Sequence, residues 1–282
     1  MIADLHNNRV CLENELFKRD IKSYGITDFE GVCNMRPLLQ CANLKRMYER
    51  VENPKSIIVC LFPYFNFIPK KQNLSLYAGL PDYHNVIIPV LKDICDSLSQ
   101  KTGYSFTAFT DNSPIPEVIT AVRAGLGVKG DNGLLISDEY GSFVFIGEIV
   151  TDMPFEYTIS EQKECIHCGE CKKACPTKKL DGKGECLSQI TQKKGDLTDE
   201  EKVLIKNSGI VWGCDVCQLV CPMNNINKNR KTAPYKDFAA SEEDFFITKE
   251  QVPIRIKNSA FSFRGDKPIL RNIDIVKSDY EK

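Results

Sequence analysis

The stretch of sequence that decides the fold is Cys165-Ile-His-Cys168-Gly-Glu-Cys171-Lys-Lys-Ala-Cys175-Pro176. Its spacing, C-x2-C-x2-C-x3-C-P, is typical of a loop that binds a [4Fe–4S] cluster through cysteine thiolates. A shorter version, C-x2-C-x3-C-P, follows at Cys214-Asp-Val-Cys217-Gln-Leu-Val-Cys221-Pro222. The short C-x2-C step lets one loop wrap a cubane, so that successive thiolates reach different irons. The two motifs therefore predict a protein that binds two clusters and moves single electrons.

The cysteines can be divided between the two clusters. Two cubanes need eight thiolates, and the two motifs supply seven of them. Cys186 is the other cysteine in this region, so we assign it as the eighth ligand. In two-cluster ferredoxins the last cysteine of each run binds the other cluster. This crossover predicts one cluster on Cys165, Cys168, Cys171 and Cys221, and a second cluster on Cys175, Cys186, Cys214 and Cys217.

Structural zinc is the alternative for these cysteines, because pairs of C-x2-C also bind zinc through four thiolates. Zinc ribbons use paired C-x2-C arms, however, and a run of four cysteines that ends in C-P favours iron–sulfur clusters. His167 lies inside the first loop. We expect its ring to be solvated or to contact a ligand, since eight thiolates already complete both sites.

The bulk composition is that of an ordinary globular protein. The chain has 282 residues, 42% of them hydrophobic and 27% charged, with a formal net charge of −1. This charge gives no global attraction to nucleic acid or to an anionic membrane. The N-terminus carries no signal peptide, and no apolar run approaches the roughly 20 residues that span a bilayer. We therefore expect a cytoplasmic protein with no membrane association, whose 13 cysteines form no disulfide framework.

Three regions follow one another along the chain, and together they predict an α+β fold. Residues 1–158 are expected to form a mixed α/β domain that carries the cofactor and the catalytic groups. Residues 159–226 are expected to form a bacterial ferredoxin-like domain with two [4Fe–4S] clusters. Residues 227–282 are polar and weakly periodic, and we expect this tail to pack on the ferredoxin-like domain.

Apolar periodicity and turn residues predict the elements of the first region. Residues 56–62 are a short apolar run suited to a buried strand. Apolar residues at helical spacing from Ile87 to Leu98 predict a helix whose first turn contains Pro89. The other predicted elements are a strand at 104–109, a helix at 116–124 that Gly125 ends, and a pair of strands at 134–136 and 142–150 joined by a turn.

Two loops in the first region have the spacing of functional segments. Gly125-Leu-Gly127-Val-Lys-Gly130 has the G-x-G-x-x-G spacing of dinucleotide-binding loops. It follows a predicted helix, whereas the dinucleotide loop follows a strand, so we do not assign it to a nucleotide. Asp111-Asn-Ser-Pro114 follows a predicted strand, where loops often present catalytic groups. An Asx-turn or a helix cap is the alternative role of Asp111.

A series of short segments between about residue 50 and residue 275 occurs in the order known from one family. These segments are Y-A…D-Y-H (77–84), D-x-x-P-x-x-E (111–117), A-G-L-G…G-x-N (124–132), G-S-F (141–143), G-E-I-x-T-D (147–152), G-C-D-V-C-Q-L-V-C-P (213–222) and F-R-G…R-N (263–272). The chain resembles the epoxyqueuosine reductase family, a group of iron–sulfur and cobalamin enzymes of tRNA queuosine biosynthesis.

This resemblance implies a base-off cobalamin bound between the N-terminal domain and the ferredoxin-like domain. In the family the clusters reduce the cobalt to Co(I), and epoxyqueuosine in tRNA loses its epoxide oxygen to give queuosine. The family's proton donor is the aspartate that matches Asp111, since the departing oxygen has to be protonated. Glu117 is expected to be a charge in the first turn of a helix. The implied cofactor contacts, where glycine backbone approaches the corrin closely, are Asp111, Gly125, Gly127, Gly130, Asn132 and Ser142.

Some features depart from the family pattern. Val128 stands where the family has Trp, and Asp131 stands where it has Lys. The C-terminal helical repeats that help family members to hold tRNA have no counterpart in the 282 residues. A small basic group near the second motif is either a phosphate contact or a solvated charge run, and it consists of Lys228, Arg230 and Lys231.

The leading interpretation is a cobalamin-dependent epoxyqueuosine reductase of a short type, with tRNA as its substrate. We expect a monomer that takes electrons from an external low-potential donor such as ferredoxin or flavodoxin. One alternative is a non-catalytic iron–sulfur electron carrier, which would retain no corrinoid. The other is a related corrinoid-dependent reductase with a non-tRNA substrate, which would not turn over tRNA that carries epoxyqueuosine.

Overall fold

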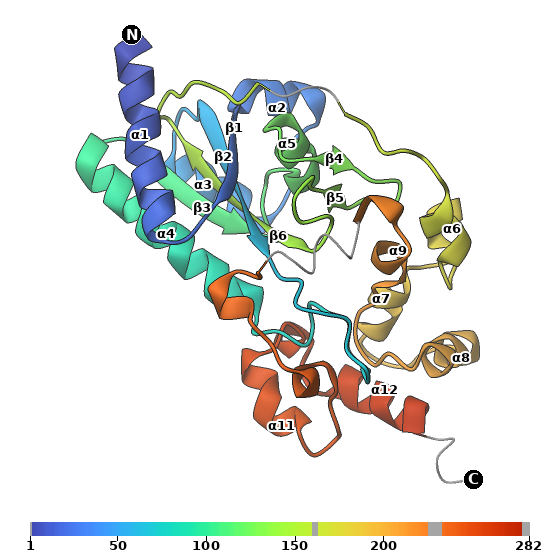
Figure 1. Ribbon diagram of the computed structural model, residues 1–282. Helices are drawn as coiled ribbons and strands as arrows, with labels where there is room; N and C mark the ends of the chain where they lie inside the picture. Colours follow the sequence, from blue (N-terminus) through green and yellow to red (C-terminus); the bar gives the residue numbers. More distant parts are fainter. Residues whose placement is uncertain (1, 160–162, 225–232, 278–282) are drawn as a thin grey trace. The chain divides into compact units, whose positions relative to one another are not determined.

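The computed structural model describes residues 2–159, 163–224 and 233–277. The chain divides into two compact units. Unit 1 consists of Met1–Pro63 and Val86–Cys165, and unit 2 consists of Tyr64–Asn85 and Ile166–Lys282. Figure 1 shows the helices and strands of both units.

Unit 1 is built around a four-stranded antiparallel sheet (Figure 1). The strand order is β1-β2-β6-β3, with β1 at Ser23–Asp28, β2 at Ser56–Pro63, β3 at Phe106–Thr110 and β6 at Val144–Thr151. The strands predicted at 56–62 and 104–109 are confirmed as β2 and β3. The apolar run of β2 is continuous because both faces of this strand are buried.

Helices cover one face of the sheet through a shared apolar core. The core joins α2 (Phe29–Met35), α3 (Ala42–Arg50) and α5 (Glu117–Arg123) to Ile57 and Val59 of β2. Successive side chains of a strand point to opposite faces, so these alternate residues mark the face that the three helices cover. The helix predicted at 116–124 is therefore confirmed as α5.

The other face of the sheet packs against α4 (Tyr83–Thr102). A Cβ atom added to Gly147 of β6 would lie 2.7 Å from Leu91 Cδ1 of this helix, so the glycine permits a close approach. The end of α1 (Ile2–Lys18) is joined to α4 by the ion pairs Glu15–Lys101 and Arg19–Asp93.

The start of α4 corrects the prediction for Pro89. The Asp82 carboxylate accepts the backbone N–H of His84 at 3.0 Å and so caps the first turn. The helix therefore begins at Tyr83, and Pro89 lies in its second turn rather than in its first.

The pairing of residues 134–136 also differs from the prediction, which joined them to 142–150. β5 (Leu135–Ile136) pairs instead with β4 (Val128–Lys129) in a separate two-stranded sheet. The expected turn is present as a bridge between Ser137 and Gly141, but β6 joins the main sheet. Gly127 explains the difference, because its φ of 148° and its missing Cβ let the chain double back onto β5.

Unit 2 consists of short helices joined by loops. Its helix α8 (Asp199–Ser208) begins with a capping box between Thr198 and Glu201, and it ends at Gly209. The other α-helices are α6 (Glu170–Ala174), α7 (Leu187–Thr191), α9 (Val216–Leu219), α11 (Val252–Arg255) and α12 (Lys267–Lys277). Short 3-10 helices lie at Lys179–Asp181, Pro222–Asn224, Lys236–Phe238, Glu242–Phe245, Ile256–Asn258 and Ser262–Arg264.

Unit 2 differs from the predicted ranges because it includes a segment from the first region. Residues 64–85 belong to it, and Leu74 forms a parallel bridge with Trp212. The Ser75 N–H donates to the Trp212 carbonyl at 2.9 Å, and the Val211 N–H donates to the Asn73 carbonyl at 2.7 Å. The tail contributes to the same core, through residues that include Ile247, Val252, Phe261, Ile269 and Ile273.

Among the described residues, none of the helices has the length and the apolar content needed to cross a bilayer.

Candidate functional site

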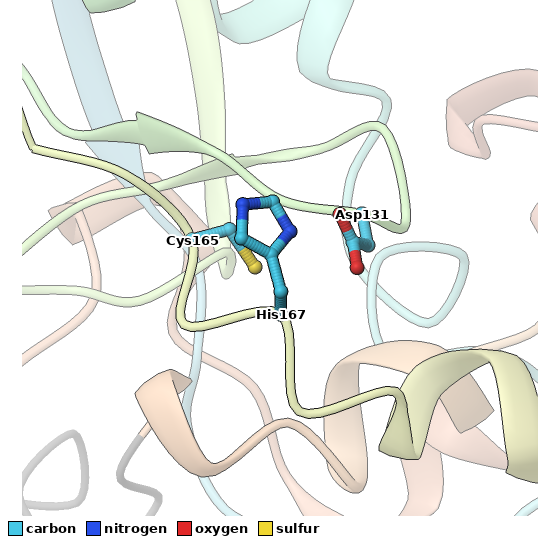
Figure 2. A group of neighbouring side chains, drawn as sticks. All are labelled: Asp131, Cys165 and His167. Atoms are coloured by element: carbon cyan, nitrogen blue, oxygen red, sulfur yellow. The ribbon is translucent and has the colours of Figure 1, made fainter.

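The first cysteine motif turns sharply at two residues with left-handed backbone. His167 has φ 50°, and Gly169, which precedes α6, has φ 76°. The left-handed region is strained for a residue other than glycine, and such strain is common where a loop wraps a ligand. Figure 2 shows the side chains of Cys165 and His167 at the start of this motif.

The second predicted set of cluster ligands gathers within unit 2. Burial, together with the Asp215 carboxyl and the Cys186 and Cys175 thiols, raises the pKa of Cys214 to about 11. Burial, the thiols of Cys214, Cys186 and Cys171 and the Asp215 carboxyl raise the pKa of Cys217 to about 12. Cys214 therefore lies near Cys175, Cys186 and Cys217, and Cys171 of the other predicted set also lies near Cys217. A cluster fits this group, because bound iron stabilises thiolates that burial alone would keep protonated.

The first predicted set of ligands is divided by the boundary between the units. Cys168, Cys171 and Cys221 belong to unit 2, and Cys165 is the last residue of unit 1. Helix α6, which carries Cys171, contacts α9, which carries Cys217. The two cysteine motifs therefore lie side by side in unit 2. None of the 13 cysteines is joined in a disulfide in this structure.

Asp131 lies beside the first cysteine of the motif (Figure 2). Both residues belong to unit 1, and the Asp131 carboxylate has an oxygen within 4.8 Å of the Cys165 sulfur. The second departure from the family pattern, Val128, is 2% exposed in β4. The basic group at 228–231 lies outside the described residues.

The backbone before the second motif is braced by the segment that joins unit 2 from the first region. Gly213 has φ 83°, and a Cβ atom there would lie 1.9 Å from Ser75 Oγ. The buried Asp215 carboxylate accepts the backbone N–H of Leu76 at 2.7 Å. Burial raises the pKa of Asp215 to about 6. Residues 75 and 76 thus fix the loop that presents Cys214 and Cys217.

Asp111 directly follows the last residue of β3, and its side chain is exposed. Its φ of 52° lies in the left-handed region, which is uncommon for aspartate. Neighbouring segments hold the loop that follows. Asn43 Nδ2 donates to the Asn112 carbonyl at 2.7 Å, and the Leu39 N–H donates to the Pro114 carbonyl at 2.8 Å. The structure therefore presents Asp111 on a fixed loop rather than on a free one.

Two glutamates lie behind this loop, and sequence reasoning missed their association. Glu117 opens α5 as predicted, but its Oε1 atom is buried and its carboxyl interacts with the charge of Glu148 of β6. Burial and the negative charges of Glu148 and Asp111 raise the pKa of Glu117 well above its usual range. Burial raises the pKa of Glu148 to about 8. The signal in the sequence was a glutamate in the middle of the apolar strand at 144–151.

The other predicted cofactor residues lie beyond the far end of α5. Gly125, with φ 78°, ends that helix, and its N–H donates to the Val122 carbonyl at 3.0 Å. A Cβ atom at Gly127 would lie 2.2 Å from the Ile136 carbonyl oxygen, and one at Gly130 would lie 2.5 Å from Asn132 Oδ1. The chain's own turns therefore account for these glycines, and their approach to a corrin stays a prediction. The same holds for Asn132, which is half-buried, and for Ser142, which is 5% exposed.

Comparison with known families identifies both parts of the chain. Residues 164–224 match the family model of a 4Fe-4S double cluster binding domain. Residues 45–112 match the family model of epoxyqueuosine reductase QueG. The first match covers the cysteine motifs, and the second ends at the Asp111 loop.

Curated relatives and solved structures agree with these matches. An epoxyqueuosine reductase of Lactococcus garvieae is 36% identical over 242 residues, which is 79% of this chain and 68% of the relative. One from Cyclobacterium marinum is 34% identical over 245 residues, 81% of this chain and 78% of the relative. A crystal structure of epoxyqueuosine reductase with an epoxyqueuosine-modified tRNA-Tyr stem loop covers 98% of this chain and 82% of its own, with a TM-score of 0.78 and 23% identity. This last likeness confirms the fold.

The α/β unit and the double-cluster motifs define an iron–sulfur oxidoreductase. The chain belongs to the epoxyqueuosine reductase family, as its resemblance in sequence predicted.

Proposed function

We propose that this protein reduces epoxyqueuosine in tRNA to queuosine, with electrons that pass through two [4Fe–4S] clusters to cobalamin. The observation that carries the proposal is the gathering of the Cys175, Cys186, Cys214 and Cys217 thiols in a family member that also presents Asp111 on a fixed loop. The relatives named above supply the substrate class.

The proposed ligands follow the ferredoxin crossover. Cys175, Cys186, Cys214 and Cys217 hold one cluster, and the nearness of Cys214 to the other three thiols supports this set. Cys165, Cys168, Cys171 and Cys221 hold the other. The contact between α6 and α9 supports a short path for electrons between the clusters.

Cobalamin is the proposed site of substrate reduction, and when bound it supplies a strongly reducing cobalt centre. Two groups of residues are proposed to hold it. Asp111 is one, in its loop, and the others lie in and around the β4–β5 hairpin: Gly125, Gly127, Gly130, Asn132 and Ser142. The fit rests on the exposed side chain of Asp111 on its braced loop, because the chain's own turns already account for Gly127 and Gly130.

Asp111 is the proposed proton donor. Removal of the epoxide oxygen takes two electrons and two protons, and the oxygen leaves more readily when it is protonated. Asp111 suits this role because its side chain is exposed while its backbone is held in an uncommon conformation.

The remaining parts of the proposal concern partners and location. We expect the protein to act as a cytoplasmic monomer and to take electrons from an external low-potential donor such as ferredoxin or flavodoxin. The tRNA substrate is supported by the stem-loop complex of the related structure.

The proposal is tested by loading the purified protein anaerobically with iron, sulfide and cobalamin, and then desalting it. About eight irons and one cobalt per chain are expected, and the loaded protein should convert epoxyqueuosine in tRNA. Eight irons without retained cobalt would indicate an electron carrier instead. Retained cobalt without conversion of the tRNA would indicate a corrinoid-dependent reductase with another substrate.

A further inference from the structure

Two glutamates lie behind the Asp111 loop in unit 1: Glu148 is fully buried, and Glu117 is half-buried with a buried Oε1 atom. Glu148 lies in the central strand β6, opposite Val59 of β2 and Phe109 of β3, and it is 0% exposed. Its Oε2 accepts the Ser113 hydroxyl at 2.5 Å. Ser113 belongs to the same loop as Asp111, so this hydrogen bond ties the loop to the middle of the sheet.

Glu117 approaches Glu148 from the first turn of α5. Its carboxylate accepts the backbone N–H of Asp111, the residue whose left-handed φ needs support. Within the described part of the chain, Oε1 of Glu117 and Oε1 of Glu148 are both buried and lack hydrogen-bond partners. Each carboxyl group therefore has one buried oxygen without a donor, and burial makes such an atom costly to leave unpaired.

A proton on the pair relieves this arrangement. A protonated carboxyl carries no charge, so a proton on either group removes the repulsion between them. The groups that act on Glu117 are Glu148 and Asp111, which are both acidic, and Ser113 is the polar group that acts on Glu148. Full ionisation would therefore place two like charges in the core, which is the situation in which one carboxyl of a pair retains its proton.

We propose that Glu117 and Glu148 hold at least one proton between them at neutral pH and pass one to Asp111 after Asp111 has protonated the departing oxygen. This inference rests on the proposed role of Asp111. The first proton passes from the Asp111 carboxyl to the epoxide oxygen. The glutamate pair then neutralises the Asp111 carboxylate, which gives the second proton to the same oxygen, so that the oxygen leaves as water and Asp111 is reprotonated from solvent. The pair regains its proton from water, and the two electrons come from the external donor through the clusters. Glu117 and Glu148 are thus positioning and proton-supplying residues.

The proton itself is measured without turnover, on cluster-loaded protein that lacks cobalamin. Carboxyl carbon shifts of ¹³C-glutamate-labelled protein are followed from pH 4 to pH 10, and the two signals are assigned with Glu117→Gln and Glu148→Gln. We expect at least one protonated carboxyl in the pair at pH 7. Two carboxylates that are both ionised at pH 7 would overturn the proposal.

The supply of the proton is measured as turnover of an epoxyqueuosine-modified stem loop across the same pH range. We expect Glu117→Gln to slow repeated turnover by about tenfold, with the largest loss above neutral pH, while Glu52→Gln, a change at an exposed position of unit 1, leaves the profile unchanged. A loss of equal size at every pH would contradict proton supply and leave only a structural role. Absence of turnover in the unchanged protein would instead refute the proposed function, and the carboxyl titration would still decide whether the pair holds a proton.

Discussion

Replacement of Glu148 by glutamine should stabilise unit 1 at neutral and alkaline pH. Glu148 is fully buried, and burial raises its pKa from 4.5 to about 8. An acid whose pKa is raised on folding binds its proton more tightly in the folded state than in the unfolded state. Its contribution to stability is therefore favourable below pH 4.5, falls as the pH rises from 4.5 to about 8, and is lowest above that range.

The size of the effect follows from the same values. A tenfold change in proton affinity corresponds to about 1.4 kcal/mol, so the rise from 4.5 to about 8 corresponds to roughly 5 kcal/mol over the whole range. At pH 7 about 3 kcal/mol of this is lost relative to acid pH. Glutamine does not ionise, and its amide oxygen keeps the Ser113 hydrogen bond. Glu148→Gln should thus gain about 3 kcal/mol over the unchanged protein at pH 7 and nothing at pH 4.5.

Urea unfolding under anaerobic conditions measures this difference. Trp212, the single tryptophan of the chain, belongs to unit 2, so a circular-dichroism transition without a change in its fluorescence reports unit 1. We expect the midpoint of that transition to rise by about 1 M at pH 7, with no change for the exposed Glu52→Gln. A Glu148→Gln protein that is less stable than the unchanged one at pH 7 would refute the reasoning, because Glu148 would then act as a needed charge.

Three further predictions concern the catalytic loop, the clusters and the hairpin. Asp111→Asn should lower the rate of epoxyqueuosine reduction by about 100-fold or more while iron and cobalt contents stay unchanged; a smaller loss measured in single turnover would assign the proton to another group. Cys186→Ala should remove about four irons per chain. The control Cys11→Ala, a change in α1, should remove none. An unchanged iron content in Cys186→Ala would exclude Cys186 as a ligand. Gly127→Ala should lower the free energy of unfolding by at least about 2 kcal/mol. The control Gly133→Ala, at φ 84° with open space around it, should lower it by about 1 kcal/mol. Equal losses for the two variants in thermal or urea unfolding would show that the contact with β5 costs nothing.

The cysteine region was predictable because spacing in the sequence alone determines which thiolates one loop presents. The motifs predicted a double-cluster domain, and the family model of residues 164–224 confirms it. Strands β2 and β3 and helix α5 were predictable for a similar reason, since each is a local apolar pattern with clear turn residues at its ends.

The parts that sequence reasoning missed depend on contacts between distant residues. The partner of β5 is decided by the backbone freedom of Gly127, which no apolar pattern reveals. The place of residues 64–85 in unit 2 depends on hydrogen bonds from Asn73 and Ser75 to a segment about 140 residues further along. The pairing of Glu117 with Glu148 has the same cause, because a helix start and a central strand meet only in the folded unit.

The central claim is tested most directly by one measurement, the amount of queuosine formed in a single anaerobic turnover. Cluster- and cobalamin-loaded protein is reduced, mixed with an epoxyqueuosine-modified tRNA stem loop, quenched, and digested to nucleosides for mass spectrometry. We expect queuosine to replace epoxyqueuosine in the unchanged protein, and we expect Asp111→Asn with the same metal content to form almost none. Fully loaded protein that leaves epoxyqueuosine intact would contradict the account.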